Sequence, residues 1–269
     1  MQYEPVKRSV GRFFSGPLFM RIFLYRLLDL LLLRTWHIKK ALRNLISELP
    51  DNSEILDSGS GFGQYTWRMS GMNKTWKLTG VDIDTDQVED CTRFFKRAGI
   101  SGRVNFLVAD LTTYTDPGKF NLIISVDVME HISDDVTVFR NFFSSLKENG
   151  ILIISTPSDK GGSGAQSHKD ESFIGEHVRN GYSIADIKDK LCSAGFINID
   201  VKYTYGTPGN ISWLISMKYP VMLLNISLIF ALFLPFYYLI VFPVALILNI
   251  LDLRLSHKKG SGLIVTARK

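Results

Sequence analysis

Short apolar runs alternate with helical segments between residues 54 and 206, and this alternation constrains the fold more than any other feature of the chain. The intervals between the runs place apolar residues at helical spacing, for example Val88, Cys91 and Phe95. Near-continuous apolar strands separated by helices are typical of a parallel sheet with helices on both faces. The runs are EILDSG (54–59), KLTGVDID (77–84), RVNFLVAD (103–110), FNLIISVD (120–127), GILIISTP (150–157) and INIDVKYTYG (197–206).

The first run leads into a glycine-rich turn, LDSGSGFGQY, in which Gly59, Gly61 and Gly63 follow Asp57 at alternate positions. Glycine lets a backbone turn sharply and approach a ligand closely. A helix beginning near Gln64 would point its positive N-terminal end at that ligand. The spacing fits neither the Gly-x-Gly-x-x-Gly dinucleotide fingerprint nor a P-loop. A ligand-binding turn is therefore predicted, with a plain strand-to-helix turn as the alternative.

Polar residues also end the next three runs. Asp82 and Asp110 end the second and third, and the fourth continues into SVDVMEHI. Open α/β sheets bind ligands at the carboxyl ends of their strands. An acid at the position of Asp82 can accept hydrogen bonds from both hydroxyls of a ribose, and Asp110 can meet an adenine amino group.

Taken in order, ILDSGSGFG, LTGVDID, FLVADL, FNLIISVDVMEHI and LKENGILIISTP resemble the successive motifs of the class I S-adenosylmethionine-dependent methyltransferases. The resemblance is to the small-molecule enzymes of the ubiquinone-biosynthesis type, and it covers roughly residues 50–206 and the last strand. It implies an α/β fold, a Rossmann-like doubly wound seven-stranded sheet with an antiparallel last strand. It also implies methyl transfer with S-adenosylmethionine as the cofactor.

The resemblance assigns cofactor contacts by position. Ser58 and Ser60 stand where the family often has apolar residues or cysteine, but both are small. The implied contacts are Asp57 for the glycine loop and the methionine amino group, Gly59, Gly61 and Gly63 beneath the methionine portion, Asp82 on the ribose, Ile83 stacked on adenine, Asp110 and Leu111 at the adenine edge, and Val126 and Asp127 on the methionine side.

Methyl transfer needs an acceptor held in line and, for some acceptors, a base that removes its proton. His131, with Glu130 beside it, directly follows the fourth strand and is the expected catalytic pair; a structural role as a helix cap is the alternative. His168 and His177 lie in the long connection 158–183, which could act as a lid, and are candidate substrate contacts. No metal is expected, although the three histidines with Glu130 or Glu176 leave a metal site open as an alternative.

The acceptor is expected to be small or lipid-linked. The Asn/Asp-Pro-Pro-Tyr type of motif, typical of enzymes that methylate nucleic-acid amino groups, does not follow the fourth run, where SVDV stands instead. The strand ends also lack a basic patch with regular aromatic residues, which disfavours a nucleic-acid partner.

A run of 33 residues from Tyr219 to Leu251 carries no charge, yet GLIVTARK (262–269) then fits the seventh strand. Residues 207–260 are therefore expected to be an apolar helical insertion between strands six and seven, with both ends on one side of any membrane. One span needs about 20 apolar residues and two need about 40. A re-entrant hairpin or helices lying in one leaflet are therefore predicted, with bends at Pro235 and Pro243. A buried cap or a dimer interface is the alternative.

The N-terminal segment is basic and apolar together: residues 1–43 hold nine Lys and Arg against Glu4 and Asp29. This mixture favours a bilayer interface, with a core-packed helix bearing solvated arginines as the alternative. Two distant cysteines indicate a reducing compartment, and no signal peptide is evident.

Together these features predict three parts: a basic and apolar segment at 1–48, a methyltransferase core at 49–206 plus 261–269, and the insertion at 207–260. The expected activity is S-adenosylmethionine-dependent methylation of a lipophilic or membrane-associated small molecule, first at oxygen, on the cytoplasmic face of a membrane. Two alternatives stay open, a non-catalytic S-adenosylmethionine-binding membrane scaffold and a soluble methyltransferase with an apolar dimerisation insertion. The oligomeric state is left open.

Overall fold

The computed structural model describes residues 17–161 and 178–269, and its centre is a seven-stranded sheet in the order β3-β2-β1-β4-β5-β7-β6. The strand β7 runs antiparallel to both neighbours, and the first five strands pair in parallel. The predicted doubly wound sheet is confirmed. The strands are β1 Glu54–Ser58, β2 Lys77–Asp82, β3 Val104–Val108, β4 Phe120–Val126, β5 Leu146–Pro157, β6 Ile197–Thr204 and β7 Gly262–Arg268.

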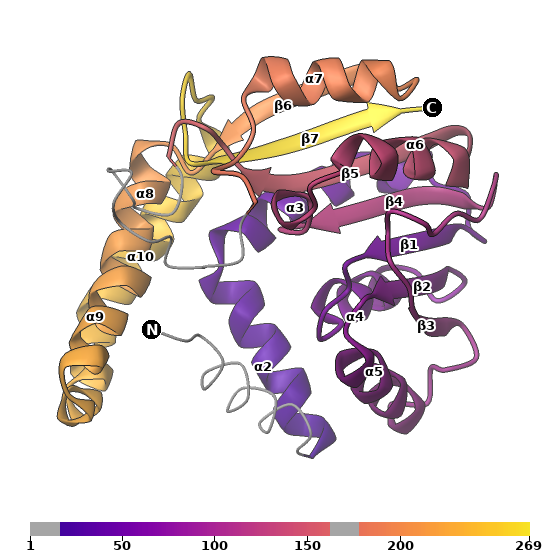
Figure 1. The fold of residues 1–269 in the computed structure, drawn as a ribbon. Coiled ribbons are helices and arrows are strands. Elements are labelled where there is room, and N and C mark those ends of the chain that lie inside the picture. Colours follow the sequence, from indigo (N-terminus) through magenta and orange to yellow (C-terminus); the bar gives the residue numbers. More distant parts are fainter. Residues whose placement is uncertain (1–16, 162–177) are drawn as a thin grey trace.

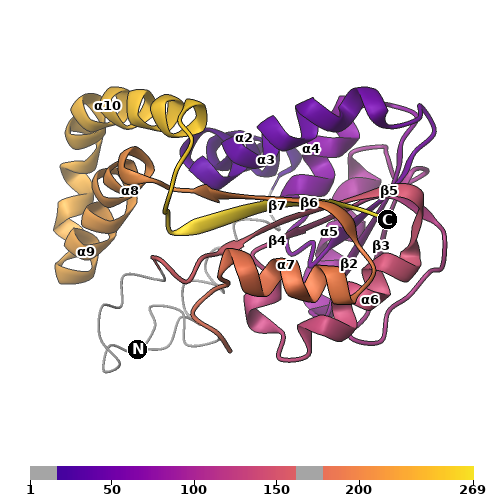
Figure 2. The same ribbon diagram turned by 90° about the horizontal axis from the view of Figure 1, so that it is seen from above.

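Helices cover both faces of this sheet (Figure 2). The helices α4 (Gln64–Met72) and α5 (Thr85–Arg97) pack on one face, and α6 (Asp135–Ser145) and α7 (Ile184–Ser193) pack on the other. Successive residues of a strand point to opposite faces. In β1, accordingly, Ile55 packs in the hydrophobic core under α4 and α5, and Leu56 packs in the core under α6 and α7. Two buried faces explain why the strand sequences are apolar throughout.

Two N-terminal helices, α2 (Leu18–Leu31) and α3 (Leu33–Leu45), followed by the short turn η1 (Ile46–Glu48), lie over the face that carries α4 and α5. The guanidinium of Arg21 is 1% exposed; it forms an ion pair with Asp90 and donates a 2.7 Å hydrogen bond to the carbonyl of Phe62. The expectation that the cations of this segment face a membrane or solvent is therefore wrong for Arg21. The other side of α2 exposes Phe19 and Phe23.

The insertion between β6 and β7 is a helical hairpin (Figure 1). Its first arm is a continuous helix made of α8 (Thr207–Trp213), the π-helical turn η3 (Leu214–Lys218) and α9 (Tyr219–Ile226). After the turn η4 (Leu228–Leu232), the 21-residue helix α10 (Leu234–Arg254) returns to the sheet. Each arm is about 30 Å long at 1.5 Å per residue. The first arm begins at Thr207, well before the uncharged run, so the hairpin is longer than the uncharged run suggests.

The direction of β6 decides where this hairpin stands. Because β6 and β5 both pair antiparallel with β7, β6 runs in the direction of the parallel strands. The hairpin therefore leaves the sheet at the edge formed by the carboxyl ends of β1, β2 and β4. At its root the carboxylate of Asp252 is buried, accepts from the backbone N–H of Gly209 at 3.0 Å and lies 2.9 Å from His37 Nε2. The root is thereby attached to α3.

Candidate active site

The glycine turn after β1 has a backbone conformation that residues with side chains would not readily adopt. Gly59, Gly61 and Gly63 have φ angles of 72°, 50° and 79°. A Cβ at Gly59 would come within 2.2 Å of Val128 Cγ2. Gly63 lies directly before α4, whose N-terminus is therefore turned toward the loop. The sequence predicted this turn, and the left-handed angles explain why glycine stands there.

Asp82, at the end of β2, holds the same loop. Its Oδ2 accepts a 2.7 Å hydrogen bond from the N–H of Gly61, and its Oδ1 accepts a 3.0 Å bond from the N–H of Asp84. A carboxylate oxygen has two lone pairs, so each oxygen keeps capacity for one further donor. Ile83 follows and is 71% exposed, a large apolar side chain next to a polar cradle. A ribose on Asp82 and a purine on Ile83 fit this arrangement.

The end of β3 leads into Asp110 and Leu111. Asp110 is exposed, and its Oδ1 already accepts from the N–H and the hydroxyl of Thr112, both at 2.8 Å. The side chain of Leu111 is buried in the core beside α6. Leu111 can therefore offer an adenine edge only its backbone.

Beyond β4, Asp127 has a φ of 52°, and its N–H donates to the carbonyl of Ser155 at 2.8 Å. Its carboxylate forms an ion pair with Arg34 of α3, whose backbone N–H donates to Tyr205 Oη at 2.9 Å. Val126, the last residue of β4, is paired with Ser155 of β5. Neither Arg34 nor Tyr205 is among the site residues that the sequence predicts. Arg34 lies 93 residues from Asp127, and no local pattern links them.

Asp57 is buried beneath the loop, with 2% of its surface exposed. Its Oδ2 accepts a 2.5 Å hydrogen bond from the hydroxyl of Thr66 on α4. Burial raises the pKa of Asp57 to about 6, against the opposing effect of the hydrogen bond from Thr66. Asp57 thus ties β1 to α4 around the glycine turn, and its charge depends on what binds above it.

Glu130 and His131 share the short turn η2 (Met129–His131) but face different surroundings. The Glu130 side chain is 1% exposed, accepts a 3.2 Å hydrogen bond from the hydroxyl of Thr156, and has a pKa raised by burial. His131 is partly exposed. Of the pair, His131 is the side chain that can reach a bound acceptor.

Two further candidates, His168 and His177, lie outside the described residues. In the ranges 17–161 and 178–269, no three His, Cys, Asp or Glu side chains gather closely enough to hold a metal ion.

The described residues fit S-adenosylmethionine. The left-handed glycine turn lies against Asp82, which retains hydrogen-bonding capacity, and Ile83 presents an uncovered apolar surface beside it. The carboxylate of Asp127 adds to the polar edge formed by the ends of the adjacent parallel strands β2, β1 and β4.

Comparison with known proteins gives the same assignment. The family described as "Methyltransferase domain" matches residues 49–197. Phosphoethanolamine N-methyltransferase 1 of Triticum aestivum is 31% identical over 157 residues, which are 56% of this chain and 30% of that protein. The ubiquinone biosynthesis O-methyltransferase of Rickettsia canadensis is 27% identical over 103 residues, 38% of this chain and 42% of that protein. The chain thus spans less than half the length of these two curated relatives.

Solved structures share the fold. Phosphoethanolamine N-methyltransferase 2 of Haemonchus contortus, in complex with S-adenosyl-L-methionine, superposes with a TM-score of 0.62 at 18% identity, covering 87% of this chain and 52% of that one. The [4+2]-cyclase SpnF gives 0.57 at 20% identity over 85% of this chain and 80% of that one. With the family match extending over more than half of its residues, the chain belongs to the methyltransferase domain family.

Proposed function

We propose that this protein is an S-adenosylmethionine-dependent methyltransferase that acts on a lipophilic small molecule dissolved in a membrane, and that the helical hairpin docks the enzyme there. One observation carries the proposal: the hairpin leaves the sheet at the edge where the cofactor residues gather. Within the described ranges, α10 is the single helix long and apolar enough to cross a membrane, and only 11% of its most apolar window is buried.

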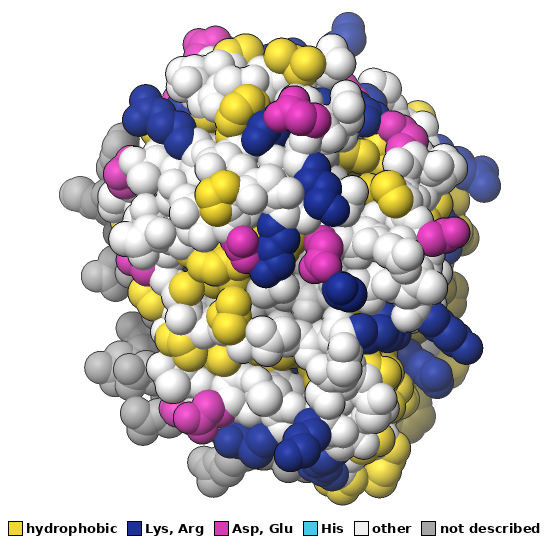
Figure 3. Space-filling model, turned by 90° about the vertical axis from the view of Figure 1, so that its right-hand side faces the viewer, with side chains coloured by type: hydrophobic (Ala, Val, Ile, Leu, Met, Phe, Trp, Pro, Cys, Tyr) yellow, Lys and Arg dark blue, Asp and Glu magenta, His cyan; other side chains and the backbone are white. Residues whose placement is uncertain are grey.

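The exposed apolar surface of the hairpin supports contact with lipid. Ile226, Phe236, Leu239 and Ile240 are all strongly exposed. Soluble monomers rarely expose large contiguous apolar patches, because these mark interfaces with proteins or membranes. The side of the molecule shown in Figure 3 differs, since Lys, Arg, Asp and Glu are interspersed there with smaller apolar areas.

Basic side chains at the root of the hairpin fit an anionic headgroup layer. Lys39, Lys40 and Arg43 of α3 line a groove together with Leu253, near the end of α10. The Nζ of Lys40 donates a 2.6 Å hydrogen bond to the Leu253 carbonyl, which attaches the groove to the helix. A Lys or Arg near an anionic leaflet contributes about 1 kcal/mol to binding. This arrangement supports the cytoplasmic face of a membrane as the location.

In methyl transfer the main role of the protein is to position the donor and the acceptor. S-adenosylmethionine supplies an electrophilic methyl group on its sulfonium. Asp82 and the glycine turn would hold the cofactor, Asp127 would lie on its methionine side, and the acceptor would approach from the hairpin. An oxygen acceptor gives up a proton, and our proposed base for it is His131, in the turn that follows β4. The two curated relatives are named for a nitrogen and an oxygen acceptor respectively, so a heteroatom acceptor is favoured.

The decisive assay combines purified protein, methyl-labelled S-adenosylmethionine and a total lipid extract of the native cell. We expect label in the organic phase, and we expect Asp82→Ala to abolish it because the cofactor is no longer held. Asp116→Ala, an exposed carboxylate paired with Lys119 away from the site, is the matched control. Mass spectrometry of the product then distinguishes O- from N-methylation.

Two other outcomes would redirect the assignment. Cofactor binding without label in either phase would support a scaffold. Label in the aqueous phase, with protein that stays in the supernatant without detergent, would support a soluble enzyme whose hairpin forms a dimer.

A further inference from the structure

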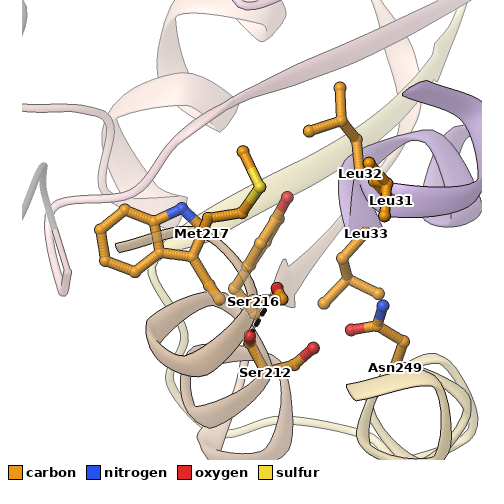
Figure 4. Close-up of a pocket in the computed structure, with 9 residues that line it drawn as sticks. Leu31, Leu32, Leu33, Ser212, Ser216, Met217 and Asn249 are labelled. Carbon is orange, nitrogen blue, oxygen red and sulfur yellow. Dashed lines mark hydrogen bonds between the residues drawn. The ribbon is translucent and has the colours of Figure 1, made fainter. Parts of the chain in front are cut away.

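A small pocket lies between the root of the hairpin and the junction of the N-terminal helices (Figure 4). Its walls come from Leu31–Leu33, where α2 passes into α3, from Trp213 and Met217 of the outgoing arm, and from α10. These walls are mainly apolar. The pocket thus opens between two elements with exposed apolar surfaces, α2 and the hairpin.

One polar atom in this pocket lacks a partner. Asn249 of α10 is 4% exposed, and its Oδ1 accepts no hydrogen bond from any residue that the structure describes. Figure 4 shows its amide on the side of α10 that faces the α2–α3 junction. Burying an amide oxygen without a donor is unfavourable. A ligand that brings an O–H or N–H group would remove this penalty.

The two serine hydroxyl groups of the pocket do not satisfy Asn249, because both donate to other acceptors. Ser212 Oγ donates to the carbonyl of Ala245 at 3.2 Å, and Ser216 Oγ donates to the carbonyl of Ser212 at 2.7 Å. Both bonds stay within the hairpin, so the amide oxygen remains the open acceptor of this wall.

The pocket is close to the cofactor site. Tyr205 forms part of its wall, and Tyr205 Oη accepts the backbone N–H of Arg34, whose guanidinium pairs with Asp127. Asn249 lies five residues before the end of α10, which corresponds to about 8 Å from the root of the hairpin. A molecule in the pocket would have its polar end at the level of lipid headgroups.

We propose that this pocket, with a volume of about 20 Å³, takes a single hydroxyl or amine group of the methyl acceptor, an amphiphile that donates from this group to Asn249 Oδ1 and whose chain lies along the hairpin. The inference rests on the proposed function and deepens it, since it names the chemical class of the acceptor and the place where it leaves the bilayer.

The test compares Asn249→Leu with Asn225→Leu in the lipid-methylation assay. Asn225 is an exposed amide on α9 of the same hairpin and does not line the pocket, so it is the matched control. We expect Asn249→Leu to lower kcat/KM for the lipid acceptor about tenfold, as loss of one buried hydrogen bond does. Cofactor affinity, measured by calorimetry, should not change. Asn225→Leu should leave both quantities within twofold.

A stability measurement separates ligand binding from a structural role. Replacing an unpartnered buried amide with leucine should raise the melting temperature of the free protein, whereas a structural Asn249 would give a lower one. Met217→Trp, which fills the pocket from the opposite arm, should reduce lipid methylation in the same way. Equal lipid methylation by wild type and both pocket variants would overturn the pocket assignment alone. Absence of organic-phase label with the wild type would instead overturn the proposed function.

Discussion

Asp57 illustrates how burial sets the state of a single residue. An unperturbed Asp has a pKa of about 3.9, whereas burial raises that of Asp57 to about 6 in the folded protein. The unfolded chain therefore holds fewer protons than the folded one between about pH 4 and 6, and the free protein loses stability as pH rises through that window.

The same pKa predicts a pH-dependent affinity for S-adenosylmethionine. In the cofactor contact that the family resemblance implies, an ionised Asp57 would stabilise the cationic amino group of the methionine portion, and a protonated one would not. We expect the affinity to decrease as pH falls through about 6, and Asp57→Asn to be weaker and independent of pH. Calorimetry between pH 5 and 7 measures this, and an unchanged slope in Asp57→Asn would exclude Asp57 as the titrating group.

Gly59 is constrained both by its backbone and by its neighbour. Gly59→Ala adds left-handed strain and places a Cβ 2.2 Å from Val128 Cγ2, so we expect a loss of about 2–4 kcal/mol in the free energy of unfolding. Gly61→Ala is the control, because its Cβ would meet only Gln87 Oε1, at 3.4 Å, and it should lose about 1 kcal/mol. Denaturant unfolding compares the two. Adding Val128→Ala to Gly59→Ala should recover the part of the stability lost to the clash with Val128, but not the part lost to backbone strain.

At the scale of elements, α2 has one side packed on the protein core and another side exposed. Its inner side carries Arg21, which pairs with Asp90 and also binds the Phe62 carbonyl, while its outer side exposes Phe19 and Phe23. One helix can therefore pack on the enzyme core and still offer an apolar stripe to a bilayer. The two interpretations of the N-terminal segment are compatible, because they concern opposite sides of α2.

The inner side of α2 gives a prediction about stability. Arg21→Met removes a buried guanidinium that pairs with Asp90 and donates to the Phe62 carbonyl, so we expect a loss of about 2 kcal/mol in the free energy of unfolding; Asp90 keeps its ion pair with Arg93 at 3.9 Å. Arg26→Met, at an exposed position of the same helix, should change it by less than about 0.5 kcal/mol. Unfolding monitored by circular dichroism in detergent tests this pair, and equal effects would mean that α2 does not dock through Arg21.

At the scale of the whole molecule, the hairpin is an addition to a complete sheet. Thr204 of β6 lies opposite Gly262 of β7, and the N–H of Ser261 donates to the Tyr205 carbonyl. The strands are thus already close enough for a tight turn where the hairpin leaves them. Membrane contact and cofactor binding can therefore be separated.

Replacing residues 206–260 with an Asn-Gly turn should abolish flotation with anionic vesicles, because the exposed apolar arms are gone. Affinity for S-adenosylmethionine should fall no more than about threefold, since the glycine turn and Asp82 stay in place. Some stability should be lost with the contact between His37 and Asp252. Flotation by the shortened protein would show that α2 or the N-terminal residues bind lipid by themselves.

The sequence alone determined the sheet, the glycine turn and the residues at its carboxyl edge. Alternating apolar runs and left-handed glycines are local properties, and parallel pairing brings strand ends together whatever the details of packing. Only the tertiary structure decided that Arg34 meets Asp127, that Arg21 turns inward and that Asn249 faces a pocket. These contacts join residues far apart in the chain, so they depend on how helices pack rather than on local propensity. The hairpin combines both: its apolar character is written in the sequence, whereas the length of its arms and its position beside the cofactor site follow from the direction of β6.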